Sequence, residues 1–238
     1  MARASIDTRK HHDFFQPEKV RDKIHIIGCG AIGSTVAELL VRLGLTNLVL
    51  YDYDIVEAKN VANQMFRQVD IGKDKTEALK DILVQINPEL ERTLQIEGKY
   101  ENQKLDGYVF LAVDNIEVRK SIVKDNRHNS AIKGVFDFRM RLEDAQHYAA
   151  DWRSLEMQRE LYATMDFTQE EAEEQTPVSA CNETLSVAFT VRSIVTAGVE
   201  NFVYFVKDRS KLKKSIYHYA DNMENMVFDR TDALGATA

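Results

Sequence analysis

Cysteine is scarce in this chain, and positive charge is not in excess. The 238 residues include two cysteines, Cys29 and Cys181, which form no C-x-x-C pair, so a four-cysteine zinc site is excluded. Lysine and arginine total 31 against 38 aspartates and glutamates, which gives a formal net charge of −7. This balance argues against a general binding surface for DNA or for an anionic membrane.

The sequence also lacks an uninterrupted membrane-spanning run. Its longest apolar segment, residues 185–206, contains Arg192 and Glu200 and is predicted to form a long buried helix instead. The polar start of the chain, MARASIDTRKHHD, shows no secretory signal. We therefore expect a soluble cytoplasmic protein with no membrane partner, of a length that suits one α/β domain with additions.

The most informative stretch is residues 23–54, KIHIIGCGAIGSTVAELLVRLGLTNLVLYDYD. Its pattern predicts a strand, a glycine-rich turn, a helix and a second strand that ends in Asp52. Such a turn lets the backbone approach a phosphate, the helix start offers free N–H groups to it, and the acid can bind ribose hydroxyls. The turn can alternatively serve helix–sheet packing alone. The predicted phosphate-binding backbone comprises Gly28, Gly30, Ala31, Ile32 and Gly33.

The remaining pattern predicts a Rossmann-like, doubly wound, mostly parallel α/β sheet with antiparallel additions and a long C-terminal helix. Further strands are expected over 47–51, 93–97, 108–112 and 133–137, with an antiparallel edge strand over 146–150 and a strand-like pair over 215–219 and 226–228. Helices are expected over 31–43, 75–86, 115–124, 153–163 and 185–206.

Three segments are expected to differ from the central domain at 23–207. An N-terminal arm covers 1–22, an acidic mobile loop covers 164–182, and a tail covers 208–238. The arm is either a floppy segment that its two aromatic residues pin to the body, or a segment that places Arg9 near a phosphate. The long polar connection after Asp54 is itself unusual, since long ordered loops in compact domains tend to be functional.

Asp114 follows the apolar strand over 108–112, at the edge where open α/β sheets bind ligands. Two interpretations of this acid stand side by side. It can serve a ligand, or it can cap the helix that begins at about residue 115.

Together these motifs resemble the ThiF/MoeB superfamily, which includes the ubiquitin-activating enzymes. The similarity covers roughly residues 20 to 207, and DFRMRLE at 137–143 is similar to a segment of phage and plasmid members. The other matching elements are GCGAIG at 28–33, DYDIVEAKN at 52–60, Gln64, DIGKDK at 70–75 and AVDN at 112–115.

The resemblance implies an activity and a set of site residues. Family members bind Mg-ATP and transfer AMP to a carboxylate, usually at the C-terminal glycine of a ubiquitin-like or sulfur-carrier protein, while some members instead activate a peptide amide or a carboxylate on modified tRNA. For this chain the expected partner is a ubiquitin-like or sulfur-carrier protein or a peptide. Asp114 matches the acid that handles magnesium, which is a hard oxygen ligand, and Lys75 matches a lysine near the phosphates. Asn60 and Gln64 match a polar pair around the α-phosphate, and Asp52 matches the ribose acid.

One departure from the family pattern concerns charge. The usual segment is Asn-Leu-x-Arg-Gln, whereas this chain places the uncharged Asn63 at the arginine position. Arg67 lies one helical turn later and is predicted to supply the missing cation, while Arg9 is similar to an arginine that relatives lend across a dimer interface. The resemblance thus also implies a homodimer. Asp54 belongs to the matched segment and is included in the predicted nucleotide site.

Four further residues leave alternatives open. Cys181 precedes the last long helix, where it can form a thioester or simply be a small buried residue. Cys29 lies inside the glycine turn and is expected to pack against the sheet. Asp137 and Arg139 form either a structural pair or a substrate contact.

Three functions are consistent with these residues to different degrees. The first is an adenylyltransferase that activates a carboxylate. The second is a catalytically inactive nucleotide-binding scaffold of the same fold, which Asn63 favours. The third is an NAD-dependent oxidoreductase, which explains the glycine turn and Asp52 but leaves Lys75 and Asp114 unexplained.

Overall fold

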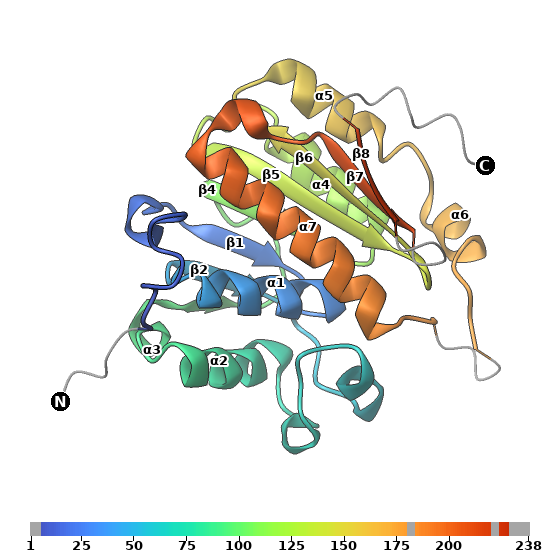
Figure 1. The fold of residues 1–238 in the computed structure, drawn as a ribbon. Coiled ribbons are helices and arrows are strands. Elements are labelled where there is room, and N and C mark those ends of the chain that lie inside the picture. The colour runs from blue at the N-terminus through green and yellow to red at the C-terminus, as the bar shows by residue number, and fades with distance from the viewer. Residues whose placement is uncertain (1–5, 180–183, 220–223, 229–238) are drawn as a thin grey trace.

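An eight-stranded sheet forms the centre of the structure, a computed structural model that describes residues 6–179, 184–219 and 224–228 (Figure 1). Its strand order is β3-β2-β1-β4-β5-β6-β7-β8. Neighbouring strands run parallel from β3 to β5 and antiparallel from β5 to β8. The strands are β1 (Ile24–Ile27), β2 (Leu48–Tyr51), β3 (Gln95–Glu97), β4 (Gly107–Leu111), β5 (Ile132–Met140), β6 (Asp144–Asp151), β7 (Ser215–Tyr219) and β8 (Glu224–Phe228).

Helices cover both faces of the sheet, which confirms the predicted Rossmann-like, doubly wound architecture and its long C-terminal helix. One face is packed against α1, α2 and α7, and the other against α4 and α5 (Figure 1). The helices are α1 (Ala31–Arg42), α2 (Lys75–Ile86), α3 (Leu90–Thr93), α4 (Ile116–Asp125), α5 (Leu155–Ala163), α6 (Gln169–Glu174) and α7 (Ala188–Lys207), with short 3-10 turns at η1 (Pro17–Lys19), η2 (Ala58–Ala62), η3 (Gln68–Asp70) and η4 (Arg209–Lys211).

The apolar patterns of the sequence account for these elements. Every residue of β1 and β4 is buried, as expected of parallel strands that helices cover on both sides. Helix α7 packs on the sheet through aromatic rings, with Phe202 and Phe205 lying 5.4 Å and 5.8 Å from the ring of Phe136. These contacts explain why a 20-residue apolar helix is a core element of this fold.

The strand predicted over 146–150 forms, but it is not an edge strand. It extends to Asp144–Asp151 as β6, pairing with β5 on one side and β7 on the other. The edge prediction was wrong because the segment predicted as a C-terminal tail contributes β7 and β8 to the same sheet. Their alternation was visible in the sequence, but their partner strand was not.

The acidic segment predicted to be a loop contains helix α6 within its described part, residues 164–179. Thr168 and Glu171 form a capping box, each side chain accepting a hydrogen bond from the other's backbone N–H. The spacing T-x-x-E is a sequence signature of a helix start, so this signal was present and was outweighed by the acidic composition.

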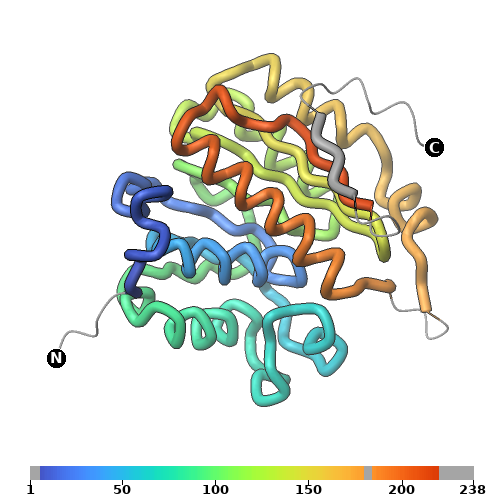
Figure 2. The backbone as a smooth tube through the Cα atoms, viewed as in Figure 1, coloured from blue at the N-terminus to red at the C-terminus, as the bar shows by residue number. Residues whose placement is uncertain are grey.

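The N-terminal segment lies beside the last turns of α7 (Figure 2). Phe15 is buried, while Phe14 packs edge-on against Tyr204 at 6.0 Å and lies beneath the Lys207 ammonium at 3.6 Å. The two aromatic residues therefore pin the arm to the body, as the first interpretation of it predicted.

Within the part of the chain that the structure describes, no helix combines the length and the apolar character needed to cross a membrane. The run predicted to be a buried helix is α7, which lies across the sheet (Figure 1).

Candidate functional site

The carboxyl ends of three neighbouring strands meet at one edge of the sheet. Ile27 at the end of β1 pairs with Tyr51 of β2 on one side and with Leu111 of β4 on the other. The residues that follow these strands therefore converge, with Asp52 and Asp114 flanking the glycine turn. This is the position at which open α/β sheets bind ligands.

Two glycines of the turn are required by packing. Gly28 has a φ of +94°, and a Cβ there would lie 2.7 Å from the carbonyl oxygen of Ala112. At Gly33 a Cβ would lie 1.8 Å from the carbonyl oxygen of Gly28, so only glycine lets α1 approach the strand this closely. Packing therefore requires glycine at both positions, and that their backbone also binds a phosphate stays a prediction.

Gly30 differs from these two. A Cβ at this position would have no neighbour within 4 Å, and no side chain caps the helix that starts after it. The first N–H groups of any α-helix have no acceptor within the helix. In this turn they belong to Ala31, Ile32 and Gly33, beside open space, and together with the helix dipole they form an arrangement that suits a phosphate.

Asp52 fixes the turn through its carboxylate. Its oxygens accept hydrogen bonds from the N–H groups of Cys29 at 2.7 Å and Asp54 at 2.9 Å. The side chain is partly exposed, so the carboxylate retains room to accept a ribose hydroxyl.

Lys75 stands at the start of α2, where its ammonium lies 2.7 Å from a carboxylate oxygen of Asp54. Its backbone N–H donates to the carbonyl of Asp54 at 2.9 Å, so the pair also closes the long polar connection. The lysine side chain is 10% exposed and the aspartate 52% exposed. The ammonium is thus held at one place, next to a carboxylate that solvent can reach.

The polar pair of the connection occupies η2 and the turn after it. Asn60 is buried, and its side-chain oxygen accepts from the N–H of Glu57 at 2.8 Å, which shapes the loop. Gln64 has a buried side-chain oxygen with no hydrogen-bond partner among the described residues. A buried orphan of this kind is uncommon in folded proteins and marks a place where a partner belongs.

Asp114 is exposed and, among the described residues, has no hydrogen-bond or ion-pair partner. The interpretation of Asp114 as a helix cap is wrong. The cap of α4 is Asn115, whose side-chain oxygen accepts from the N–H groups of Glu117 at 2.9 Å and Val118 at 3.0 Å. A free carboxylate at the sheet edge is a donor that suits Mg²⁺.

The predicted substitute cations have acidic partners in the structure. Arg67 forms a two-pronged ion pair with Asp70, with distances of 2.8 Å and 3.0 Å, and Asp70 is completely buried. The pair holds the pKa of Asp70 down to about 2. Arg9 is fully exposed on the arm and pairs with Asp7 at 2.6 Å. That either arginine reaches a phosphate stays a prediction.

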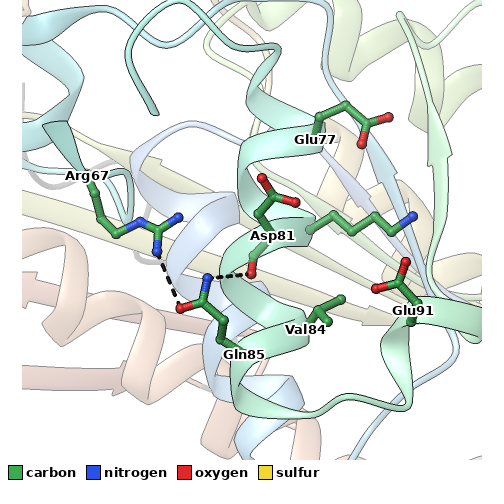
Figure 3. A pocket seen from close by; sticks show the side chains of 7 residues that line it. Arg67, Glu77, Asp81, Val84, Gln85 and Glu91 are labelled. Atoms are coloured by element: carbon green, nitrogen blue, oxygen red, sulfur yellow. Dashed lines mark hydrogen bonds between the residues drawn. The ribbon is translucent and has the colours of Figure 1, made fainter. Parts of the chain in front are cut away.

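Arg67 also borders a surface hollow of about 350 Å³ on the outer side of α2 (Figure 3). Its guanidinium reaches Gln85, and the remaining lining is mostly polar and of mixed sign, including Lys80 and Asp81. None of the residues predicted to bind the nucleotide other than Arg67 lines this hollow.

Asp137 and Arg139 form a buried ion pair, and a third residue joins them. The carboxylate of Asp137, within β5 where that strand pairs with Leu111 at the end of β4, accepts from Arg139 at 2.8 Å and from Arg119 of α4. Sequence reasoning missed Arg119. Arg119 lies three residues after the buried Ile116 and three before the buried Ile122, so it falls on the apolar face of the helix. A basic residue at such a position was the signal that the sequence offered.

The predictions for the two cysteines have different outcomes. Cys29 is completely buried, and burial raises the pKa of its thiol well above the ordinary value, which agrees with a packing role. Cys181 lies outside the described residues, so its thioester role stays a prediction.

The sheet order, the glycine turn and the helices on both faces define a Rossmann-like α/β protein. The chain belongs to the ThiF family, whose model matches residues 13–226.

Curated relatives are similar over part of their length. Ubiquitin-like modifier-activating enzyme 5 of Caenorhabditis elegans is 30% identical over 131 residues, which cover 52% of this chain and 29% of that protein. The Oryza sativa subsp. japonica protein of the same name is 45% identical over 74 residues, 31% of this chain and 18% of that protein. The chain therefore spans less than a third of the length of these relatives.

Solved structures support the fold at low sequence identity. Escherichia coli MccB with ATP superimposes with a TM-score of 0.65 and 19% identity, covering 89% of this chain and 65% of that chain. PaaA superimposes with a TM-score of 0.64 and 17% identity, covering 93% of this chain and 68% of that chain.

Proposed function

We propose that this protein is an ATP-dependent adenylyltransferase that activates a carboxylate at the C-terminus of a ubiquitin-like protein, a sulfur-carrier protein or a peptide. The observation that carries the proposal is the gathering of an uncapped helix start, a fixed ammonium and an unpartnered carboxylate at one sheet edge. Membership of the ThiF family supports it, as do relatives named ubiquitin-like modifier-activating enzymes and a similar structure solved with ATP.

The residues of the edge divide the nucleotide between them. We assign the ribose to Asp52 and the phosphates to the backbone from Gly28 to Gly33 and to the Lys75 ammonium, which Asp54 holds in place. Asn60 and Gln64 lie beside the α-phosphate in this assignment, where the orphaned side-chain oxygen of Gln64 gains a partner. Arg67 remains the proposed extra cation.

Asp114 is the proposed ligand of Mg²⁺, since its carboxylate is a hard oxygen donor and pairs with no described residue. The ion supplies partial neutralisation of the triphosphate charge. Asp114 is placed to hold it because β4 ends beside the glycine turn, as the close approach of Gly28 to Ala112 requires.

The proposed reaction is a displacement at the α-phosphorus of ATP. An acceptor carboxylate oxygen forms a bond to that phosphorus while the bond to the bridging oxygen of pyrophosphate breaks, and the electron pair leaves with pyrophosphate. The products are an acyl-adenylate and pyrophosphate. No general base is needed, because a carboxylate is already ionised at neutral pH. The contribution of the protein is therefore position and positive potential, from Lys75 and the start of α1.

ATP–pyrophosphate exchange with candidate acceptor peptides tests the proposal. Each peptide is compared with its C-terminal amide, which cannot attack and serves as the matched control. We expect exchange with at least one free carboxylate, and we expect Asp114→Asn to lower it at least about 100-fold. Full exchange in Asp114→Asn would remove the metal assignment.

Asn63 gives the scaffold alternative its one specific support, because the missing arginine weakens the positive potential around the phosphates. Binding of ATP without exchange for any free-carboxylate acceptor, and unaffected by Asp114→Asn, would favour that alternative. Tight binding of NADH without binding of ATP would instead favour the oxidoreductase.

We also propose that the protein is a cytoplasmic homodimer. Sedimentation velocity of the purified chain tests the dimer, with a concentration-independent species of twice 27.3 kDa expected. A single species at the monomer mass would overturn it.

A further inference from the structure

A buried charge cluster of Arg119, Asp137 and Arg139 lies directly behind the turn that carries Asp114. The Asp137 side chain is fully buried, Arg119 is 7% exposed and Arg139 is 13% exposed. One carboxylate thus holds two guanidinium groups out of water. Burying these charges carries a large desolvation cost that their hydrogen bonds must offset, which makes the location of the cluster informative.

Arg119 joins this cluster to the end of β4. Besides the Asp137 carboxylate, its guanidinium donates to the carbonyl oxygens of Leu111, at 3.4 Å, and Val113. Val113 immediately precedes Asp114, so one side chain holds the backbone on the approach to the proposed metal ligand. Arginine suits this task because its planar fork donates in several fixed directions, which a lysine ammonium does not reproduce.

Arg139 joins the same carboxylate to the segment after α5. Its guanidinium donates to the carbonyl oxygen of Thr164 at 2.6 Å and to the hydroxyl of that residue at 2.8 Å, and it lies 4.6 Å from the ring centre of Tyr148. Asp137 is therefore the bridge between the Asp114 turn and the corner at Thr164.

Two further contacts join residues 167–169, which follow this corner, to helix α4. The side-chain oxygen of Gln169 accepts from the N–H of Ile116 at 3.0 Å, and the Lys120 ammonium donates to the carbonyl of Phe167 at 2.7 Å. The turn that carries Asp114 is therefore held by the arginine cluster on its buried side and by residues 167–169 on its outer side.

We propose that Arg119, Asp137 and Arg139 are positioning residues that fix the carboxylate of Asp114 for the metal that accompanies ATP. The inference rests on the proposed function. Asp114 has no hydrogen-bond or ion-pair partner among the described residues, so its place depends on the backbone that Arg119 holds at Val113, and its charge also acts on the Arg119 guanidinium. Partners that orient a metal ligand change metal affinity, commonly by about 10- to 100-fold when they are removed.

The test measures metal binding rather than turnover. Mn²⁺ binding is titrated by electron paramagnetic resonance in the presence of a non-hydrolysable ATP analogue, and calorimetry measures binding of the analogue without metal. In Arg119→Lys we expect Mn²⁺ affinity to fall by roughly 10- to 100-fold. Binding of the analogue without metal is expected to stay within about twofold, since the phosphate-binding groups are untouched.

A milder variant guards against misfolding. Thr164→Val removes one hydrogen bond of Arg139, together with the one that the hydroxyl donates to the Leu161 carbonyl, and leaves both ion pairs, so Mn²⁺ affinity should fall by roughly two- to tenfold. The matched control is Arg209→Lys. It breaks a two-pronged pair with Asp151, at 2.9 Å and 2.8 Å, that is more exposed than the Arg119 pair and has no contact with the Asp114 turn.

The outcomes separate the two proposals. Loss of Mn²⁺ binding in Asp114→Asn together with wild-type affinity in folded Arg119→Lys and Thr164→Val would overturn the positioning role alone. An equal fall in Arg209→Lys would also overturn it, because general loosening would then explain the effect. Wild-type Mn²⁺ affinity in Asp114→Asn would overturn the metal site of the proposed function.

Discussion

The glycines of the turn perform separable tasks. A Cβ at Gly33 collides with the carbonyl of Gly28, whereas a Cβ at Gly30 meets nothing. We therefore expect Gly33→Ala to destabilise the fold by about 1–3 kcal/mol, as overpacking does. Gly30→Ala should cost no more than about 1 kcal/mol in stability, yet weaken ATP binding by occupying the space beside the helix start.

Urea unfolding and calorimetric titration of ATP on the two variants check this division. Equal stability losses in both would show that Gly30 is also a packing residue. Unchanged ATP affinity in Gly30→Ala would show that no phosphate lies beside this residue.

Arg67 and Asn63 give a second residue-scale prediction. Removing the Arg67 side chain leaves the buried Asp70 with the Lys73 ammonium at 3.2 Å and the backbone N–H of residue 67 at 3.0 Å, so Arg67→Ala should lower stability by about 1–3 kcal/mol as well as exchange activity. Asn63→Ala should affect both less, because it removes no charge. Exchange assays and urea unfolding of the two variants provide the measurement, and the reverse order of exchange rates would show that Arg67 is not the substitute cation.

Residue identities and spacing predicted much of this site, but not its internal pairing. The sheet edge and the turn followed from the local strand, turn and helix patterns, and Lys75 followed from the family resemblance. The fork of Arg67 on Asp70 and the bridge from Arg119 through Asp137 to Arg139 did not. Those contacts depend on how elements far apart in the sequence pack, which no local pattern specifies.

At the scale of elements, the join between β5, β6 and α7 contains a buried neutral histidine. Asn201 donates to Nε2 of His147 at 3.1 Å, so Nδ1 carries the proton and donates to the Asp137 carbonyl at 3.1 Å. The amide orientation of Asn201 is fixed, because its oxygen accepts from the N–H of Lys213 at 2.8 Å. Protonating Nε2 would place two donors against each other.

Burial lowers the pKa of His147 from about 6.5 to about 4. The folded state therefore favours the neutral ring, and its contribution to stability is complete above pH 6.5. As the pH falls from about 6.5 to about 4, up to about 3 kcal/mol should be lost. Burial lowers the pKa of His25 as well, which adds to the slope in the same direction.

Thermal unfolding of the wild type and of His147→Gln between pH 7 and pH 4.5 measures this contribution. The variant should be less stable at pH 7 and should lose less stability on acidification. The residual slope is that of His25 and the remaining titrating groups. Identical slopes in the two proteins would contradict the role of His147.

The largest discrepancies between sequence and structure also arose at the element scale. Strands β7 and β8 were expected in a separate tail, yet they complete the sheet. Helix α6 was expected as a loop, yet it docks on α4 through Gln169. In both cases the element was signalled locally, by alternation or by a capping box, while its partner lay elsewhere in the chain.

At the scale of the whole molecule, several elements bring their polar groups to one edge of the sheet. A parallel sheet brings the ends of β1, β2 and β4 together, α1 and α2 add a helix start and an ammonium, and the arginine cluster holds the backbone next to Asp114. The antiparallel strands β6 to β8 and helix α7 complete the core that supports this edge. Each of these groups is held in place by its own contacts, and the proposed function explains why they lie together at one edge of the sheet.

A crystal structure of the protein soaked with ATP and Mg²⁺ tests this convergence most directly. We expect the triphosphate against the first turn of α1 and the Lys75 ammonium, the ribose on Asp52, and the metal on Asp114. A triphosphate bound away from Lys75 and Asp114, or an empty sheet edge at saturating ATP, would contradict it.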